Sequence, residues 1–332
     1  MADNEVRALN DADVIEVKKT YFLDGLAYPT NVYLRLSQGH YLLLSLAGQK
    51  AQYTAFASFM NPLSQIFVEK AQYDTFIKFV TTLTEQIVDK PLPSATKAKF
   101  VQGLTSHVMQ MFESKKFSDD QHLTRVSDVV MKFAQSTNGF EEVEKVLAQI
   151  PNDDAKHSMA TCIIAIMIAE EMEFTQAQVF EKLAMAALLH DIGLYHLPNR
   201  EFLKKPRHEW TAEEVLLYES HPIRGVEALR DLKEVSQDVL LMISEHHENA
   251  LGTGFPKKIR DVKISPLGRV LIVANYFSDL LFARLETSKN YDAPLAIEFI
   301  EEVLGQPFNK QVFRCLKNII IMDEIKRKQR NS

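Results

Sequence analysis

The chain has 332 residues, of which 46% are hydrophobic and 25% charged, a composition typical of a globular protein that is long enough for two domains. Its net charge of −6 argues against a dedicated nucleic-acid binder. No apolar run reaches the roughly 18–20 residues of a membrane span, and residues 1–13 are too polar for a signal peptide. Cys162 and Cys315 are isolated, which favours a reducing, cytoplasmic location over a disulfide framework.

Residues 1–92 predict a small mixed α/β domain. β-branched and aromatic residues alternate in part over 13–19 and 30–46, with Gln38-Gly39 as a hairpin turn. A helical pattern follows over 72–88. Pro91 and Pro93 then interrupt the chain and predict a boundary near residue 92.

From residue 93 onward the sequence predicts helices almost only. Apolar residues recur at three- and four-residue spacing over 98–114, 122–136, 139–150, 154–172, 177–193, 212–220, 236–248, 266–285, 293–304 and 310–328. Thr211 and Glu214 form a capping box, and Pro222 suits the first turn of a helix with His221 at its cap. We therefore expect a mainly α protein, with a helical connector over 93–148 and a further helical domain over 149–328.

Histidines gather in the last of these domains, where seven of the ten fall between His157 and His247. Five of them lie on or beside predicted helix ends, namely His157, His190, His221, His246 and His247, and Asp191 and the helix stop Gly193 follow the second. Neutral imidazole binds iron, manganese and zinc, and a carboxylate can bridge two cations. Two such cations, about 3.5–4 Å apart, polarise a phosphoryl group and activate water. Single histidines at helix ends are more often caps or surface residues, which is our interpretation of His196 and His208.

The order of these motifs resembles the HD-GYP family of bacterial metal-dependent phosphohydrolases. The matching elements are His157, "HDIG" at 190–193, "HP" at 221–222, "HHE" at 246–248 and "GTGFP" at 252–256, within about residues 140–325. The resemblance implies an α-helical HD domain that hydrolyses cyclic di-GMP at two or three metal ions, often iron. Residues 1–92 resemble the variable, sensory domain that many such proteins carry.

The resemblance also implies a set of metal ligands, with Asp191 as the bridging, catalytic carboxylate. The ligand positions are His157, His190, Asp191, His221, His246, His247 and Asn275, which stands where the family has the aspartate of "VAD". A third metal would need an acid one turn before His157, and Asp153 occupies that place with a shorter side chain than the usual Glu. We expect two divalent transition ions, iron first, with manganese or zinc as alternatives.

The substrate side departs from the family pattern. Phe255 replaces the tyrosine of the family name, while Leu194 and Thr287 replace two lysines; Arg284 keeps its register. In the family, that tyrosine and those lysines hold substrate phosphates, and each charge-assisted contact is worth about 1.5–3 kcal/mol. We therefore predict weak or altered activity, with Arg284, Phe255 and Lys257 at the substrate.

Three functions stay open at this point. The first is a divergent phosphodiesterase that binds a cyclic dinucleotide or another phosphodiester at a binuclear metal site and hydrolyses it slowly. The second is a catalytically inactive sensor or adaptor that keeps the metal site and signals to protein partners. The third is a helical interaction module whose histidines are structural and bind no metal.

Overall fold

The computed structural model describes residues 5–22, 25–50, 64–114, 122–151, 153–282 and 290–331. The chain divides into two compact units, Met1–Leu92 and Pro93–Ser332, with the boundary between Pro91 and Pro93. Every described helix is too short or too polar to span a bilayer.

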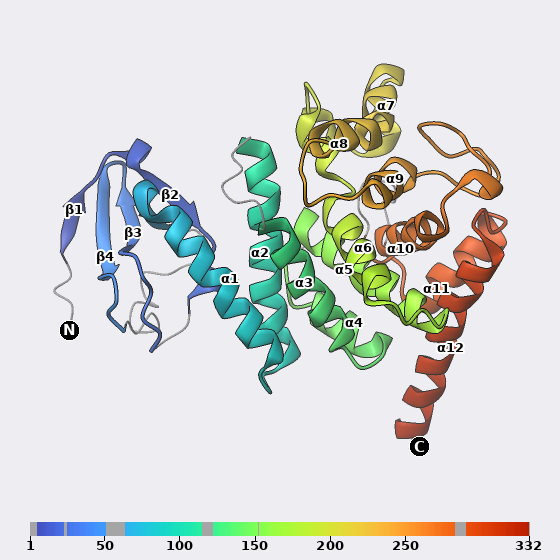
Figure 1. Cartoon of the computed structure of the whole chain (residues 1–332), viewed down its shortest axis with the longest axis horizontal. Helices are drawn as coiled ribbons and strands as arrows, with labels where there is room; N and C mark the ends of the chain where they lie inside the picture. The colour runs from blue at the N-terminus through green and yellow to red at the C-terminus, as the bar shows by residue number, and fades with distance from the viewer. Residues whose placement is uncertain are drawn as a thin grey trace. The chain divides into compact units, whose positions relative to one another are not determined.

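The first unit is a five-stranded antiparallel sheet with one long helix (Figure 1). Its elements are β1 (Val6–Ala8), β2 (Val14–Val17), β3 (Val32–Ser37), β4 (His40–Ser45), β5 (Ile66–Glu69) and α1 (Tyr73–Asp89), and the strand order is β1-β4-β3-β5-β2. The predicted turn at Gln38-Gly39 joins β3 to β4, and Gly39 has a positive φ of 72°. Asp11, between β1 and β2, accepts hydrogen bonds from the Gly39 amide (3.0 Å) and the Tyr41 hydroxyl (2.6 Å), and so fixes this turn.

All the strands lie in the first unit, and the regular secondary structure in the described part of the second unit is helical. The second unit contains α2 (Ser94–Ser114), α3 (His122–Gln135), α4 (Phe140–Leu147), α5 (Asp154–Glu171), α6 (Ala177–Leu189), α7 (Ala212–Glu219), α8 (His221–Leu229), α9 (Gln237–Glu245), α10 (Pro266–Phe282), α11 (Ala293–Glu298) and α12 (Lys310–Asn331). A short 3-10 helix, η5 (Ile192–His196), follows α6, and a π-helical turn over Phe299–Val303 extends α11. The predicted mainly α fold with a smaller mixed N-terminal part is confirmed.

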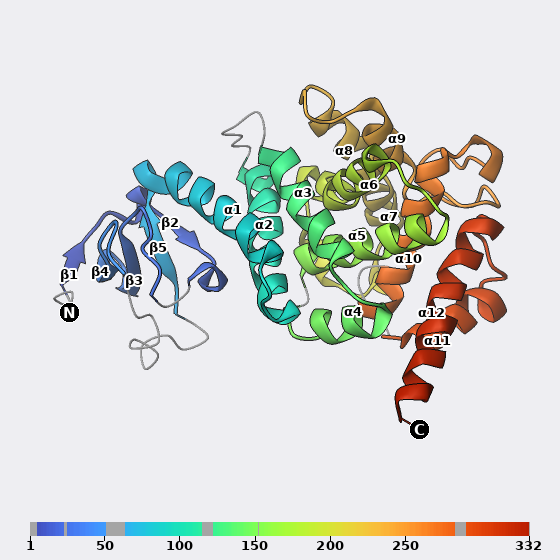
Figure 2. The same cartoon turned by 60° about the horizontal axis from the view of Figure 1, so that its bottom comes forward.

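Helix α5 lies at the centre of this unit, surrounded by α2, α3, α6, α10 and α12 (Figure 2). Nearly all its side chains are buried, because apolar residues cover its whole circumference rather than one stripe. A helix of that kind must be enclosed by others, so His157 near its start lies deep in the unit.

Several helix ends follow local rules that the sequence already contains. The Thr211–Glu214 capping box at α7 is confirmed in both directions. His221 is not the cap residue that we expected but the first residue of α8. Ser220 is both the C-cap residue of α7 and the N-cap residue of α8, because the two helices follow each other directly.

Gly193 has a different role from the helix stop that the sequence suggests. Its φ is not positive, and a Cβ built there would overlap the carbonyl oxygen of His221 and lie 2.7 Å from the Gly225 amide nitrogen. The glycine therefore allows η5 to pack backbone to backbone against α8, which brings Asp191 and His221 together.

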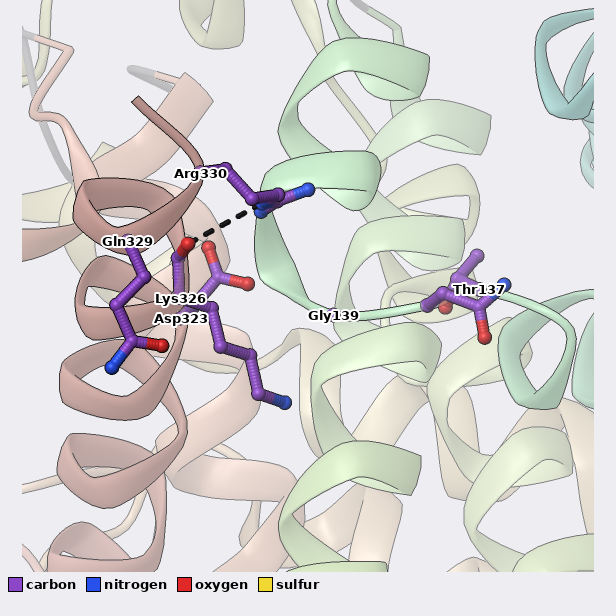
Figure 3. A pocket seen from close by; sticks show the side chains of 7 residues that line it. Thr137, Gly139, Asp323, Lys326, Gln329 and Arg330 are labelled. Atoms are coloured by element: carbon purple, nitrogen blue, oxygen red, sulfur yellow. Dashed lines mark hydrogen bonds between the residues drawn. The ribbon is translucent and has the colours of Figure 1, made fainter. Parts of the chain in front are cut away.

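A surface pocket of about 550 Å³ lies between the loop before α4 and the end of α12 (Figure 3). At its side the Asp323 carboxylate accepts hydrogen bonds from the Phe140 (3.1 Å) and Glu141 (3.0 Å) amides, which caps α4 with a residue far away in the chain. Arg330 Nε donates to the Lys326 carbonyl within α12 (3.4 Å).

Candidate metal centre

Five predicted histidine ligands meet around one carboxylate, that of Asp191. Asp191, His221, His246 and His247 form one group whose ligand atoms lie within 4.8 Å of one another, and His157, His190 and Asp191 form a second. Asp191 belongs to both. Its Oδ2 lies 3.2 Å from His190 Nε2, while its Oδ1 lies 3.3 Å from His221 Nε2 and 3.6 Å from His246 Nε2. Each carboxylate oxygen thus faces one histidine group, which is the geometry of a bridging ligand.

Helix ends set the orientation of three of the rings. The Nδ1 atoms of His190, His221 and His246 lie 2.9, 2.7 and 2.6 Å from the carbonyl oxygens three residues earlier, on Ala187, Tyr218 and Ile243. A carbonyl oxygen can only accept, so Nδ1 carries the proton in each case. With Nδ1 bound to a carbonyl, Nε2 is the nitrogen that each ring turns towards Asp191.

This arrangement of lone pairs fits a cation. His221 Nε2 and His246 Nε2 are 3.0 Å apart, and His157 Nε2 and His190 Nε2 are 3.1 Å apart. Two unprotonated nitrogens at such distances repel each other and the carboxylate unless positive charge lies between them. In the first of these pairs, His246 does not supply that charge as a proton at neutral pH, because burial lowers its pKa to about 4. The donor set of imidazole and carboxylate suits iron, manganese or zinc.

His157 differs from the other candidate ligands in how its ring is held. Its Nδ1 lies 3.2 Å from Ser278 Oγ and 3.6 Å from Asp279 Oδ1, both on α10. Its Nε2 lies 2.8 Å from Asn275 Oδ1, so the amide oxygen at the "VAN" position points into the second group. Ser278 is thus the hydrogen-bond partner of Nδ1, and the Asp279 carboxylate lies just beyond hydrogen-bond distance of it. Carboxylates behind an imidazole are common around metal-bound histidines, where they orient the ring and raise its basicity.

Three buried acidic residues were not among the predicted site residues. Asp279 follows Asn275 by four residues on the same helix, and this spacing in the sequence predicts that both lie on one helix face. Glu245 Oε2 accepts from the Ser265 amide (3.0 Å) and hydroxyl (2.6 Å), which joins the end of α9 to the start of α10. Glu248 accepts from the Lys257 (2.6 Å) and Ile259 (3.0 Å) amides and so holds the loop after "GTGFP" against the histidine pair.

Among the described residues, Asp153 and Lys257 lie outside the two histidine groups. Asp153 caps α5, where its Oδ1 accepts from the Lys156 amide (2.9 Å) and Gln102 Nε2 (3.1 Å), so its role as a third-metal ligand stays a prediction. Lys257 is exposed on the loop. Arg284 and Thr287 lie outside the described residues.

Phe255 belongs to an aromatic wall beside the candidate metal centre. This wall is a buried cluster with the members Leu194, Leu197, Phe202, Trp210, Tyr218 and Phe255. The Phe255 ring stacks on His247, with centroids 4.4 Å apart and an angle of 20° between the planes. Burial lowers the pKa of His247 well below the ordinary value.

Comparison with known proteins agrees with this geometry. The model of the family described as "HD domain" matches residues 141–310. A cyclic di-GMP phosphodiesterase of Pseudomonas aeruginosa is 30% identical over 211 residues, which are 63% of this chain and 50% of that protein. A 3'3'-cGAMP-specific phosphodiesterase of Vibrio cholerae is 29% identical over 171 residues, 50% of this chain and 35% of that protein. The chain thus spans half or less of the length of these relatives.

A solved structure shares the fold over most of the chain. It is described as an HDG"Y"P protein from Bdellovibrio bacteriovorus, with a TM-score of 0.68 and 21% identity, and the match covers 93% of this chain and 99% of that one. The resemblance that the motifs predict is therefore confirmed. This chain belongs to the HD domain family, and it is an HD-GYP-type member with phenylalanine at the tyrosine position.

Proposed function

We propose that this protein binds a cyclic dinucleotide, or a related phosphodiester, at a binuclear metal centre and hydrolyses it with weak or altered activity. The observation that carries this proposal is the position of Asp191, whose two oxygens face separate histidine groups. The curated relatives named as cyclic di-GMP and cGAMP phosphodiesterases support the substrate class.

The proposed roles follow from charge and burial. His157, His190 and Asn275 would hold one divalent ion, and His221, His246 and His247 the other, with Asp191 shared by both. Bound ions would polarise a phosphoryl group and lower the pKa of water. The backbone-anchored rings keep the ligand nitrogens in place, and Phe255 excludes water from one side of His247. We propose iron first, with manganese or zinc as alternatives.

The first experiment measures metal and turnover in the same preparation. We expect protein purified without oxygen to hold about two equivalents of transition metal by elemental analysis, and to convert cyclic di-GMP or 3'3'-cGAMP slowly to linear products in a chromatographic assay. The double variant H246A/H247A should lose metal while it keeps its helical circular dichroism. The matched control is H208A, because His208 is an exposed histidine whose contact is an ion pair with Glu209 at 3.9 Å. Wild-type protein without metal, after growth with ample iron and manganese, would end the proposal.

A sensor or adaptor without catalysis is the second candidate. Leu194 and Phe255, both buried in the aromatic wall, favour it, since neither can donate a hydrogen bond to a phosphate. Calorimetry would decide between the two: binding of cyclic di-GMP by metal-loaded protein without turnover supports the sensor, and sustained turnover excludes it. The buried, unpaired Cys162 and Cys315 suit a reducing, cytoplasmic location, which stays a proposal.

A further inference from the structure

Tyr218 touches the metal centre at both its main chain and its side chain. Its carbonyl oxygen accepts the Nδ1 proton of His221 (2.7 Å), and its ring lies 4.9 Å from the His221 ring and 5.8 Å from the His247 ring, centroid to centroid. Its phenolic oxygen lies 3.5 Å from His247 Nε2.

The surroundings hold the ring of Tyr218 in one place. Trp210 packs against it with centroids 5.2 Å apart, and the Arg207 guanidinium lies 5.2 Å from its centroid. Phe255 contacts it from the side of the histidines at 5.8 Å. Only 2% of Tyr218 is exposed, so its hydroxyl has a fixed direction towards His247.

The hydroxyl lies where the aromatic wall otherwise presents apolar groups to the histidines. Leu194 and Phe255 occupy the positions at which the family resemblance implies a lysine and a tyrosine. The Phe255 ring is stacked flat on His247 and has no polar atom to offer a ligand. Tyr218 brings a phenol to the same histidine from α7, a different element of the chain.

The distance between the Tyr218 hydroxyl and His247 Nε2 indicates how strong their hydrogen bond is. An O–H hydrogen bond is usually 2.5–3.0 Å long, so a 3.5 Å contact with His247 Nε2 is a weak one. His247 belongs to the first histidine group, and if its Nε2 binds a cation there, that lone pair accepts no hydrogen bond. The geometry points to Tyr218 as a further ligand-binding residue: we propose that its hydroxyl donates to a phosphate oxygen of the bound phosphodiester, in place of the hydroxyl that Phe255 lacks. This inference rests on the proposed function.

The test compares Y218F with wild-type protein of equal metal content. Calorimetric titration with inorganic phosphate and with cyclic di-GMP should show affinity about tenfold or more weaker in Y218F, because one hydrogen bond to a charged oxygen is lost. Metal content and melting temperature should stay at the wild-type values. The matched control is Y195F: Tyr195 is a half-buried tyrosine of η5 whose hydroxyl donates to Asp154 (2.7 Å), so phosphate affinity should not change.

A second variant tests whether a hydroxyl at position 255 can bind the same ligand oxygen as the hydroxyl of Tyr218. In Y218F/F255Y the missing hydroxyl is supplied from position 255, and we expect phosphate affinity to recover towards the wild-type value. Unchanged affinity in Y218F at full metal occupancy would overturn the inference, as would equal losses in Y218F and Y195F. Loss of metal from Y218F would overturn it too, because the residue would then act only by holding His247 or His221. Metal-loaded wild-type protein that binds neither probe would instead contradict the proposed function itself.

Discussion

Replacement of Gly193 by alanine tests how closely η5 and α8 must approach to build the metal centre. The added Cβ would overlap the His221 carbonyl oxygen and lie 2.7 Å from the Gly225 nitrogen. Both are backbone atoms, so neither can rotate away as a flexible side chain would. The two elements must move apart, and because the same residue, His221, belongs to the candidate metal centre, we expect G193A to lower both stability and metal content.

The size of the effect follows from the kind of clash. Overpacking a well-packed interior costs about 1–3 kcal/mol, and a collision with backbone belongs at the upper end of that range. For a unit of this size, 1 kcal/mol corresponds to about 2–4 °C in melting temperature, so a fall of about 6–12 °C is expected. Thermal unfolding followed by circular dichroism measures the first quantity and elemental analysis the second.

Gly225, on the other side of the same contact, provides the control. A Cβ there would lie 3.3 Å from a methyl group of Ile243 and 3.4 Å from the Gly193 nitrogen, distances that a small adjustment relieves. Alanine also favours a helix over glycine by up to about 1 kcal/mol. G225A should therefore melt near the wild-type temperature with full metal. A G193A protein that melts and binds metal like wild type would refute this account of how η5 positions Asp191.

Three further predictions concern other buried groups. D279N replaces the carboxylate behind His157 with a neutral amide and should lower metal affinity about 10–100-fold in a chelator competition. Equal metal affinities in D279N and wild type would contradict this role of Asp279. Burial lowers the pKa of His107 from 6.5 to about 3, so the unfolded chain takes up the proton first as the pH falls, and stability is lost from about pH 6.5 downward. His107 should thus lower the free energy of unfolding by about 2 kcal/mol at pH 5 relative to pH 8. H107L should reduce the pH dependence of this free energy by that amount, and an identical pH dependence in H107L and wild type would show that His107 is not the group responsible. E248Q removes one of two carboxylate acceptors for the Lys257 and Ile259 amides, so hydrogen exchange at these amides should speed up, whereas unchanged exchange would show that another contact holds the loop.

Periodicity and local motifs were enough to predict the helices and the hairpin. Helices form where apolar residues recur on one face, and the capping box of α7 needs only Thr211 and Glu214. The central place of α5 is likewise visible in its apolar circumference. The family order of histidines then indicated which helix ends converge, because no local rule states that residues as far apart as His157 and His246 meet.

What the sequence could not show depends on contacts between distant elements. Gly193 is typical of a helix stop in the sequence, and only the backbone of α8 against it gives the actual reason for a glycine. Asp153 precedes His157 by one turn, yet it caps the helix instead of lying on its face. Tyr218 has no motif around it, and its place at His247 follows from the packing of Trp210 and Phe255.

The bonds from three ligand rings to carbonyls three residues earlier have a consequence for the protein without metal. Those carbonyls belong to the last turn of α6, to the last turn of α7 and to the last turn of α9. Release of a ring from its carbonyl and fraying of that helix end are therefore coupled. A bound ion that holds the three rings would stabilise all three helix termini at once. Removing the ion with a chelator should appear as faster amide exchange at these termini, long before the unit as a whole unfolds.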